Sequence, residues 1–137
     1  MLTMSIRMSS ATCATADLVL SIAFLSMGSV VPTPSLADPV LLRFRSALAD
    51  LYGDEIDRVV LFGSRARGDA RPDSDWDVAV FLKSLPDRWV ELDRLADLCG
   101  SFIDDANVFF DAKPYPAVAY QERTPLMREI RREGLTL

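Results

Sequence analysis

Residues 62–82 read FGSRARGDARPDSDWDVAVFL, and this stretch joins two apolar runs that have the length and composition of short buried strands. The polar part between them runs from Gly63 to Ser74 and is expected to form a loop with at most one helical turn. Alternate side chains in a strand share a face, so Asp75 and Asp77 are expected to point the same way, with Trp76 opposite. The stretch therefore predicts two adjacent strands with a carboxylate pair at the start of the second.

Composition narrows the chemistry that the chain can perform. Its 137 residues suggest one domain, and its net charge of −5 argues against binding nucleic acid through bulk electrostatics. It has no histidine, which excludes Ser-His-Asp triads and His-ligated zinc. The two cysteines, Cys13 and Cys99, are too far apart for a CxxC motif, and Cys99 is expected to be a buried core thiol. Catalysis must therefore depend on carboxylates, hydroxyls, arginine, lysine or a metal ion bound by oxygen atoms.

The other hydrophobic patterns predict an α-β-β-α-β-α order, which is typical of an α/β (α+β) fold with a mixed sheet and helices packed on it. Capping residues and helical or alternating periodicity define the elements. They are a helix from Asp38 to Gly53, strands over 57–62 and 75–82, a helix after Asp87, a strand over 107–112, a connector from Lys113 to Ala119 and a helix over 124–134.

The first 38 residues differ in composition from the rest, so we divide the chain into an extension, 1–38, and a domain, 39–137. The apolar run 18–27 is too short to span a bilayer. It is similar to the apolar region of a signal peptide, but we favour a translation start placed too early, with Met27 as the natural start, or a disordered or amphipathic extension. We expect a cytoplasmic protein without a membrane partner.

The carboxylate pair indicates a site for a hard divalent cation. Asp75 and Asp77 offer oxygen ligands of the kind that Mg²⁺ takes together with phosphate and water. An EF-hand is excluded, because its sixth and twelfth positions would be Val78 and Ser84 where glycine and glutamate are required. A solvated acidic turn is the structural alternative, but it does not explain a carboxylate pair leading into an apolar strand.

The start of the loop indicates a phosphate site. Gly63 allows close approach of a ligand to the backbone, and the Ser64 hydroxyl and the following N–H groups can bind phosphate oxygens. Arg65 and Arg67 add donors suited to phosphate. A P-loop is excluded, because no Gly-Lys-Ser/Thr sequence follows. A phosphate site beside metal ligands is the arrangement needed for phosphoryl or nucleotidyl transfer.

Gly63-Ser64, ten intervening residues and then Asp75-Trp76-Asp77 resemble the GS-x10-DxD signature of the DNA polymerase β-like nucleotidyltransferases, and the minimal nucleotidyltransferases in particular. The resemblance covers roughly residues 39–137 and implies a compact palm-like fold. It implies an NTP, in the first place ATP, and Mg²⁺ as ligands, with the two aspartates as metal ligands and the Gly-Ser pair at the triphosphate. Many relatives are antitoxins paired with helical HEPN ribonuclease toxins, some of which they modify with AMP.

The resemblance also implies a third carboxylate on a later strand, which binds metal and activates the attacking hydroxyl. In the expected strand 107–112, Asn107, Phe109 and Asp111 share a face, and only Asp111 is a carboxylate. We therefore take Asp111 as the third catalytic and metal-binding candidate. Asp104 and Asp105 precede the strand and are expected to be charges at the end of a helix.

Three functions remain open at this point. The first is a Mg²⁺-dependent nucleotidyltransferase that moves NMP to a hydroxyl group, for example on a partner toxin. The second is a degenerate nucleotidyltransferase that neutralises a toxin by contact alone, and the third is an enzyme that modifies a small molecule such as an antibiotic. The first two imply a complex with a partner protein, and a homo-oligomer is also open.

Overall fold

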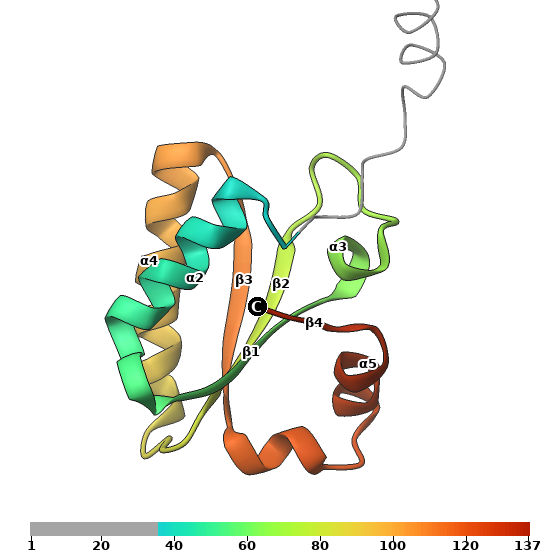
Figure 1. The fold of residues 1–137 in the computed structure, drawn as a ribbon. Coiled ribbons are helices and arrows are strands. Elements are labelled where there is room, and N and C mark those ends of the chain that lie inside the picture. Colours follow the sequence, from blue (N-terminus) through green and yellow to red (C-terminus); the bar gives the residue numbers. More distant parts are fainter. Residues whose placement is uncertain (1–35) are drawn as a thin grey trace, which may run out of the picture. The chain divides into compact units, whose positions relative to one another are not determined.

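The computed structural model describes residues 36–137, so most of the predicted extension lies outside the described residues. Its sheet has the order β3-β2-β1-β4, in which β1 is antiparallel to β2 and β4, and β2 is parallel to β3 (Figure 1). The elements are α2 (Pro39–Tyr52), η1 (Gly53–Glu55), β1 (Ile56–Phe62), α3 (Gly63–Arg67), β2 (Trp76–Leu82), α4 (Arg88–Ala106), β3 (Phe110–Pro116), η2 (Ala117–Gln121), α5 (Pro125–Glu133) and β4 (Leu135–Thr136). The predicted mixed sheet with packed helices is confirmed.

The three long helices begin where their capping residues predict. Asp38 accepts a hydrogen bond from the backbone N–H of Val40 at 2.9 Å, at the start of α2. Asp87 caps α4 in the same way, and the hydroxyl of Thr124 accepts the N–H of Met127 at 3.2 Å in α5. Each cap satisfies a donor that the first helical turn leaves without an intrahelical partner.

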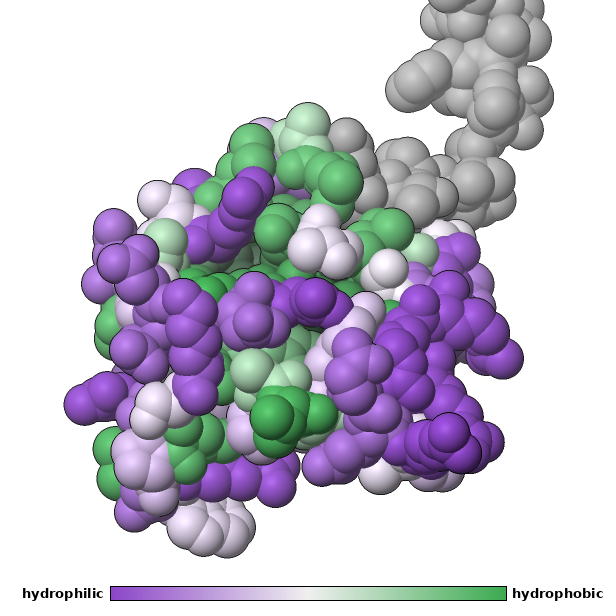
Figure 2. All heavy atoms as spheres, turned by 60° about the horizontal axis from the view of Figure 1, so that its bottom comes forward, coloured by the Kyte–Doolittle hydropathy of each residue, from purple (hydrophilic) through white to green (hydrophobic). Residues whose placement is uncertain are grey.

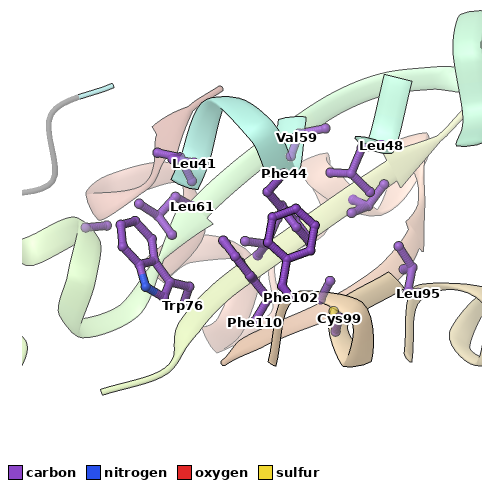
Figure 3. Packing of buried hydrophobic residues seen from close by; sticks show 14 of the residues in the cluster. Leu41, Phe44, Leu48, Val59, Leu61, Trp76, Leu95, Cys99, Phe102 and Phe110 are labelled. Atoms are coloured by element: carbon purple, nitrogen blue, oxygen red, sulfur yellow. The ribbon is translucent and has the colours of Figure 1, made fainter. Parts of the chain in front are cut away.

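One face of the sheet carries the main hydrophobic core, under α2 and α4 (Figure 3). Phe44 of α2 stacks on Phe110 of β3 with ring centroids 3.9 Å apart and meets Phe102 of α4 edge to face at 5.3 Å. Cys99 is buried in this cluster, as predicted, and burial raises the pKa of its thiol. The helices on this face therefore fix the sheet from one side and leave the other side to the rest of the chain.

The opposite face carries a smaller core, formed with η2 and α5. Ala79 and Phe81 of β2 point to this face, whereas Val78 and Val80 point to the main core. Asp77 precedes Ala79 by two residues in β2, so its side chain points to the same face as those of Ala79 and Phe81. The carboxylate is therefore on the side of the sheet that α2 and α4 do not cover.

The third strand is displaced from its predicted position. It spans Phe110–Pro116, whereas the sequence pattern predicted a strand over 107–112 followed by a connector. Asn107 instead ends α4 in a left-handed conformation with φ 52°. The two prolines in the strand, Pro114 and Pro116, are tolerated because β3 is at the edge of the sheet, where backbone donors are not all needed.

The short strand β4 was not predicted, and it depends on Gly134. The φ of this residue is an ordinary −71°, but a Cβ here would clash with the carbonyl oxygen of Ile130 and with Cγ1 of Val60. We expect Gly134→Ala to lower the free energy of unfolding by about 1–3 kcal/mol, because backbone atoms cannot move aside cheaply. Urea denaturation measures this loss.

Gly100→Ala is the matched control for that substitution. Gly100 lies within α4, and a Cβ there meets open space. Alanine is the better helix former, so this variant is expected to gain up to about 1 kcal/mol. Equal stability changes in the two variants would contradict the packing argument.

The end of the sheet away from Asp77 has a partly apolar surface. Figure 2 brings the lower end of Figure 1 forward and shows apolar side chains near its middle, between polar groups on either side. Trp89, which follows the end of β2, is 75% exposed, and Val118, which follows the end of β3, is 76% exposed.

No helix within residues 36–137 is both long and apolar enough to cross a membrane.

Candidate functional site

The site is centred on the contact between Gly63 and Asp77. Phe62, the last residue of β1, is the antiparallel partner of Asp77 in β2, so the next residue along the chain lies beside that carboxylate. Gly63 has φ 72°, and a Cβ on it would clash with Oδ2 of Asp77 and lie 3.2 Å from Cγ. Only glycine allows both this backbone conformation and this approach. The Gly-Ser pair, which opens α3, and the Asp-x-Asp pair are thus brought together.

Three carboxylates are directed to this region from two strands. Asp75 is exposed and immediately precedes β2, Asp77 is half-buried, and Asp111 of β3 is the parallel partner of Asp77. Burial raises the pKa of the Asp77 carboxyl, and the negative charges of Asp111 and Asp75 raise it further, whereas Lys113 and Arg67 lower it. The site therefore concentrates negative charge at one edge of the sheet.

Asp111 also has a partner that sequence reasoning missed. The Nζ atom of Lys113 donates to Oδ2 of Asp111 at 2.7 Å, and this hydrogen bond raises the pKa of the lysine. The strand alternation that placed Asp111 on this face could have found Lys113, two residues later, but the strand was predicted to end before it.

The donor set fits a hard cation through its chemistry. Carboxylate oxygens that repel each other are ligands that Mg²⁺ accepts, with phosphate and water completing the shell. Within the described range 36–137, however, no group of three or more carboxylate, thiolate or imidazole side chains is gathered closely enough to hold a metal by itself. The roles of Asp75, Asp77 and Asp111 as Mg²⁺ ligands stay predictions.

Arg65 binds the protein's own backbone. Its guanidinium donates to the carbonyl oxygen of Ser74 at 2.8 and 3.2 Å and to that of Pro72 at 3.1 Å. It also lies over the ring of Trp76, 4.7 Å from the centroid. Arg65 therefore holds the loop that leads to Asp75, a role different from the predicted contact with nucleotide.

We expect Arg65→Lys to lower the free energy of unfolding by about 1–2 kcal/mol, because an ammonium cannot reproduce the planar fork that joins two carbonyls. Urea denaturation measures the loss, and limited proteolysis reports whether the loop at Pro72 becomes easier to cleave. Arg71→Lys, the same change at an exposed position of this loop, is the control. Identical behaviour of the two variants would refute the role of Arg65.

Arg67 is also bound within the protein. It pairs with Asp69 at 3.2 Å and with Glu129 and Glu133 of α5 at 3.3 Å each. These contacts use Nε and Nη1 of Arg67, so a nucleotide contact through either atom would have to replace one of them. The interaction ties α3 to α5.

A hollow of about 350 Å³ opens beside the loop that carries Asp75. It lies between the α3–β2 loop and the segment that follows α4. Its lining is formed by Arg65, Pro72, Asp73, Ser74, Trp76, Asn107, Val108 and Phe109. Phe109 is 52% exposed, so this hollow combines polar groups with an accessible aromatic ring.

Asp104 and Asp105 lie in the last turn of α4, outside the site. Asp105 faces Arg43 of α2 across 3.8 Å. Both aspartates are charges at the end of a helix, as predicted.

Known structures and proteins resemble this chain. The structure described as "Crystal structure of the toxin-antitoxin with AMP-PNP" matches with a TM-score of 0.48 and 20% identity, over 69% of each chain. A mutant of the toxin-antitoxin MntA-HpeT matches with a TM-score of 0.48 and 18% identity, again over 69% of each chain.

Two curated relatives come from Methanocaldococcus jannaschii. "Putative protein adenylyltransferase MJ0141" is 40% identical over 47 residues, which are 34% of this chain and 48% of that protein. "Putative protein adenylyltransferase MJ1305" is 37% identical over 65 residues, 47% of this chain and 44% of that protein. The matches thus span about half the length of these relatives.

The family model described as "Nucleotidyltransferase domain" matches residues 41–128. The match covers more than half of the chain and includes most of α2, the Gly-Ser pair, both strands of the carboxylate site and the greater part of the sheet. This chain belongs to the nucleotidyltransferase domain family.

Proposed function

We propose that this protein transfers AMP from ATP to a hydroxyl group on a partner protein. The observation that carries the proposal is the contact of Gly63 with Asp77, which brings the Gly-Ser turn against this carboxylate. We assign the turn to phosphate and the carboxylate to Mg²⁺. Membership of the nucleotidyltransferase domain family supports the reaction class. The names of the two curated relatives, which describe protein adenylyltransferases, support AMP as the group and protein as the acceptor.

The proposed reaction joins an acceptor oxygen to the α-phosphorus of ATP and breaks the bond between the α- and β-phosphates. Pyrophosphate leaves with the electron pair of that bond. Mg²⁺, when bound, would be held by Asp75, Asp77 and Asp111 and would supply positive charge to the phosphates. Gly63 and Ser64 offer backbone N–H groups and a hydroxyl to the triphosphate. Asp111, on the neighbouring strand, would accept the acceptor's proton.

We propose a helical HEPN-type ribonuclease toxin as the protein acceptor, which makes this protein an antitoxin. The support is the GS-x10-DxD signature, because many minimal nucleotidyltransferases that it resembles are paired with such toxins.

Position-specific labelling of ATP tests the reaction class. The full chain is incubated with Mg²⁺ and the candidate partner, in parallel with ATP labelled at the α-phosphate and at the γ-phosphate. Transfer of AMP places the α-label on the partner and releases the γ-label as pyrophosphate. Transfer of the γ-label would show a kinase instead, and no label on the partner together with no binding of ATP would refute the proposal.

A second candidate function is neutralisation of the partner by contact alone. It is favoured by the ion pair of Asp111 with Lys113, since this pair engages the third carboxylate. Co-expression separates the two functions. If Asp75→Asn/Asp77→Asn still relieves the partner's toxicity, contact is sufficient, and if the relief is lost while the complex still forms, catalysis is required.

A further inference from the structure

Lys113 places a cation inside the carboxylate site. It follows Asp111 by two residues on β3, so the two side chains share a face of the edge strand. The ammonium is 2.7 Å from Oδ2 of Asp111, and the two side chains are 45% and 44% exposed. Both groups therefore reach solvent, and other ligands can exchange with either of them.

The cation acts on more than one carboxylate. Asp111 is the register partner of Asp77, and its charge raises the pKa of the Asp77 carboxyl, whereas the charge of Lys113 lowers it. The ammonium thus lies within the field of both aspartates and offsets their repulsion. A divalent cation bound by these carboxylates would serve the same electrostatic purpose.

We propose that Lys113 is a positioning residue that holds Asp111 in the metal-free protein and competes with the divalent cation for that carboxylate. The inference rests on the proposed function, because it takes Asp77 and Asp111 as metal ligands. Oδ2 of Asp111 must exchange the ammonium for the metal. Lys113 therefore keeps the acidic site ordered before metal arrives and weakens metal binding when it does.

Binding of Mn²⁺ alone to the metal-free full chain tests the competition, with affinity measured by calorimetry. Lys113→Met keeps the length of the side chain and removes its charge, and it is expected to bind Mn²⁺ roughly threefold to fivefold more tightly, as a partly exposed ion pair allows. Lys113→Arg keeps the charge and is expected to bind like the wild type. In EDTA, Lys113→Met is expected to melt at a lower temperature than the wild type. Adding Mn²⁺ is expected to raise the melting temperature of this variant by more than it raises that of the wild type.

The remaining outcomes separate this inference from the proposed function. Unchanged or weaker Mn²⁺ binding by Lys113→Met, while Asp77→Asn abolishes binding, would overturn the role of Lys113 and leave the metal site intact. Equal Mn²⁺ binding by the wild type and Asp77→Asn, or none by either, would overturn the role of Lys113 and the proposed metal site together. If Lys113→Met and Lys113→Arg tightened binding equally, charge would not be the cause and the inference would fail.

Discussion

Asp77→Asn is expected to reduce AMP transfer by about a thousandfold. A catalytic metal contributes several kcal/mol of charge stabilisation, and each 1.4 kcal/mol or so is a factor of ten in rate. The amide keeps the shape of the carboxylate but not its charge, so the loss would come from the metal and not from packing. Transfer of the α-label of ATP to the partner measures it.

Asp73→Asn is the matched control. It makes the same chemical change at an exposed position of the loop two residues before Asp75, and it is expected to keep wild-type activity. Equal loss in both variants would contradict the division of this acidic stretch into two metal ligands and loop charges.

The same Asp77→Asn change is expected to stabilise the metal-free protein at neutral pH. Because burial and like charges raise the pKa of folded Asp77 above its unfolded value, the folded protein binds that proton more tightly. The ionised carboxylate therefore lowers stability at every pH above the folded pKa, and this loss disappears as pH falls below the unfolded one. In EDTA the melting temperature of Asp77→Asn should exceed that of the wild type at neutral pH. This difference should shrink as the pH falls through the raised pKa of folded Asp77, and it should vanish below the ordinary pKa of an aspartate. A gap that widened on acidification would contradict the assignment.

Gly63→Ala is expected to reduce transfer by about a hundredfold, the effect of displacing a catalytic group by about 1 Å. A Cβ at this position clashes with the end of the Asp77 side chain, which moves more easily than backbone. The positive φ adds strain of roughly 1–2 kcal/mol. The variant should therefore lose activity out of proportion to its modest loss of stability, as measured by the labelling assay and urea denaturation.

Gly53→Ala separates the effect of backbone strain from the effect of the clash with Asp77. Gly53 also has a positive φ, 52°, but a Cβ there meets nothing within 4 Å. This variant should lose stability through backbone strain alone and retain its activity. If Gly63→Ala were no less active than Gly53→Ala, the contact with Asp77 would not matter for catalysis.

Most of the fold could be predicted because its signals are local. The helices begin at Asp38, Asp87 and Thr124, whose side chains were recognisable as caps. The start of the third strand was predicted three residues too early. The prolines at its end suggested a connector, because only the order of strands in the sheet shows that β3 is an edge strand, where prolines are tolerated. The two-residue strand β4 has no periodicity of its own and forms because Gly134 packs on Val60.

The candidate site was predictable where spacing along one strand determines it. The alternation of Asp75 and Asp77 predicted that both carboxylates lie near the start of β2. The glycine after β1 was predicted to allow close approach of a ligand, and in the structure it allows close approach of the Asp77 side chain. The partners of Arg65 and Arg67 could not be predicted, because a guanidinium binds phosphate and protein carbonyls or carboxylates equally well. Lys113 was missed because the end of β3 was misplaced.

The pairing of β1 with β2 has a consequence for how faults in folding would affect the protein. Phe62 lies opposite Asp77, and the same register sends Val78 and Val80 into the main core. A slip of β2 by one residue would exchange its two faces, bringing Asp77 beneath α2 and α4 and moving those valines to the smaller core in place of Ala79 and Phe81. Misregistered chains would therefore bury a carboxylate in the main core, mispack both cores and lose the carboxylate site together, so the sheet disfavours a stably folded form that lacks the site.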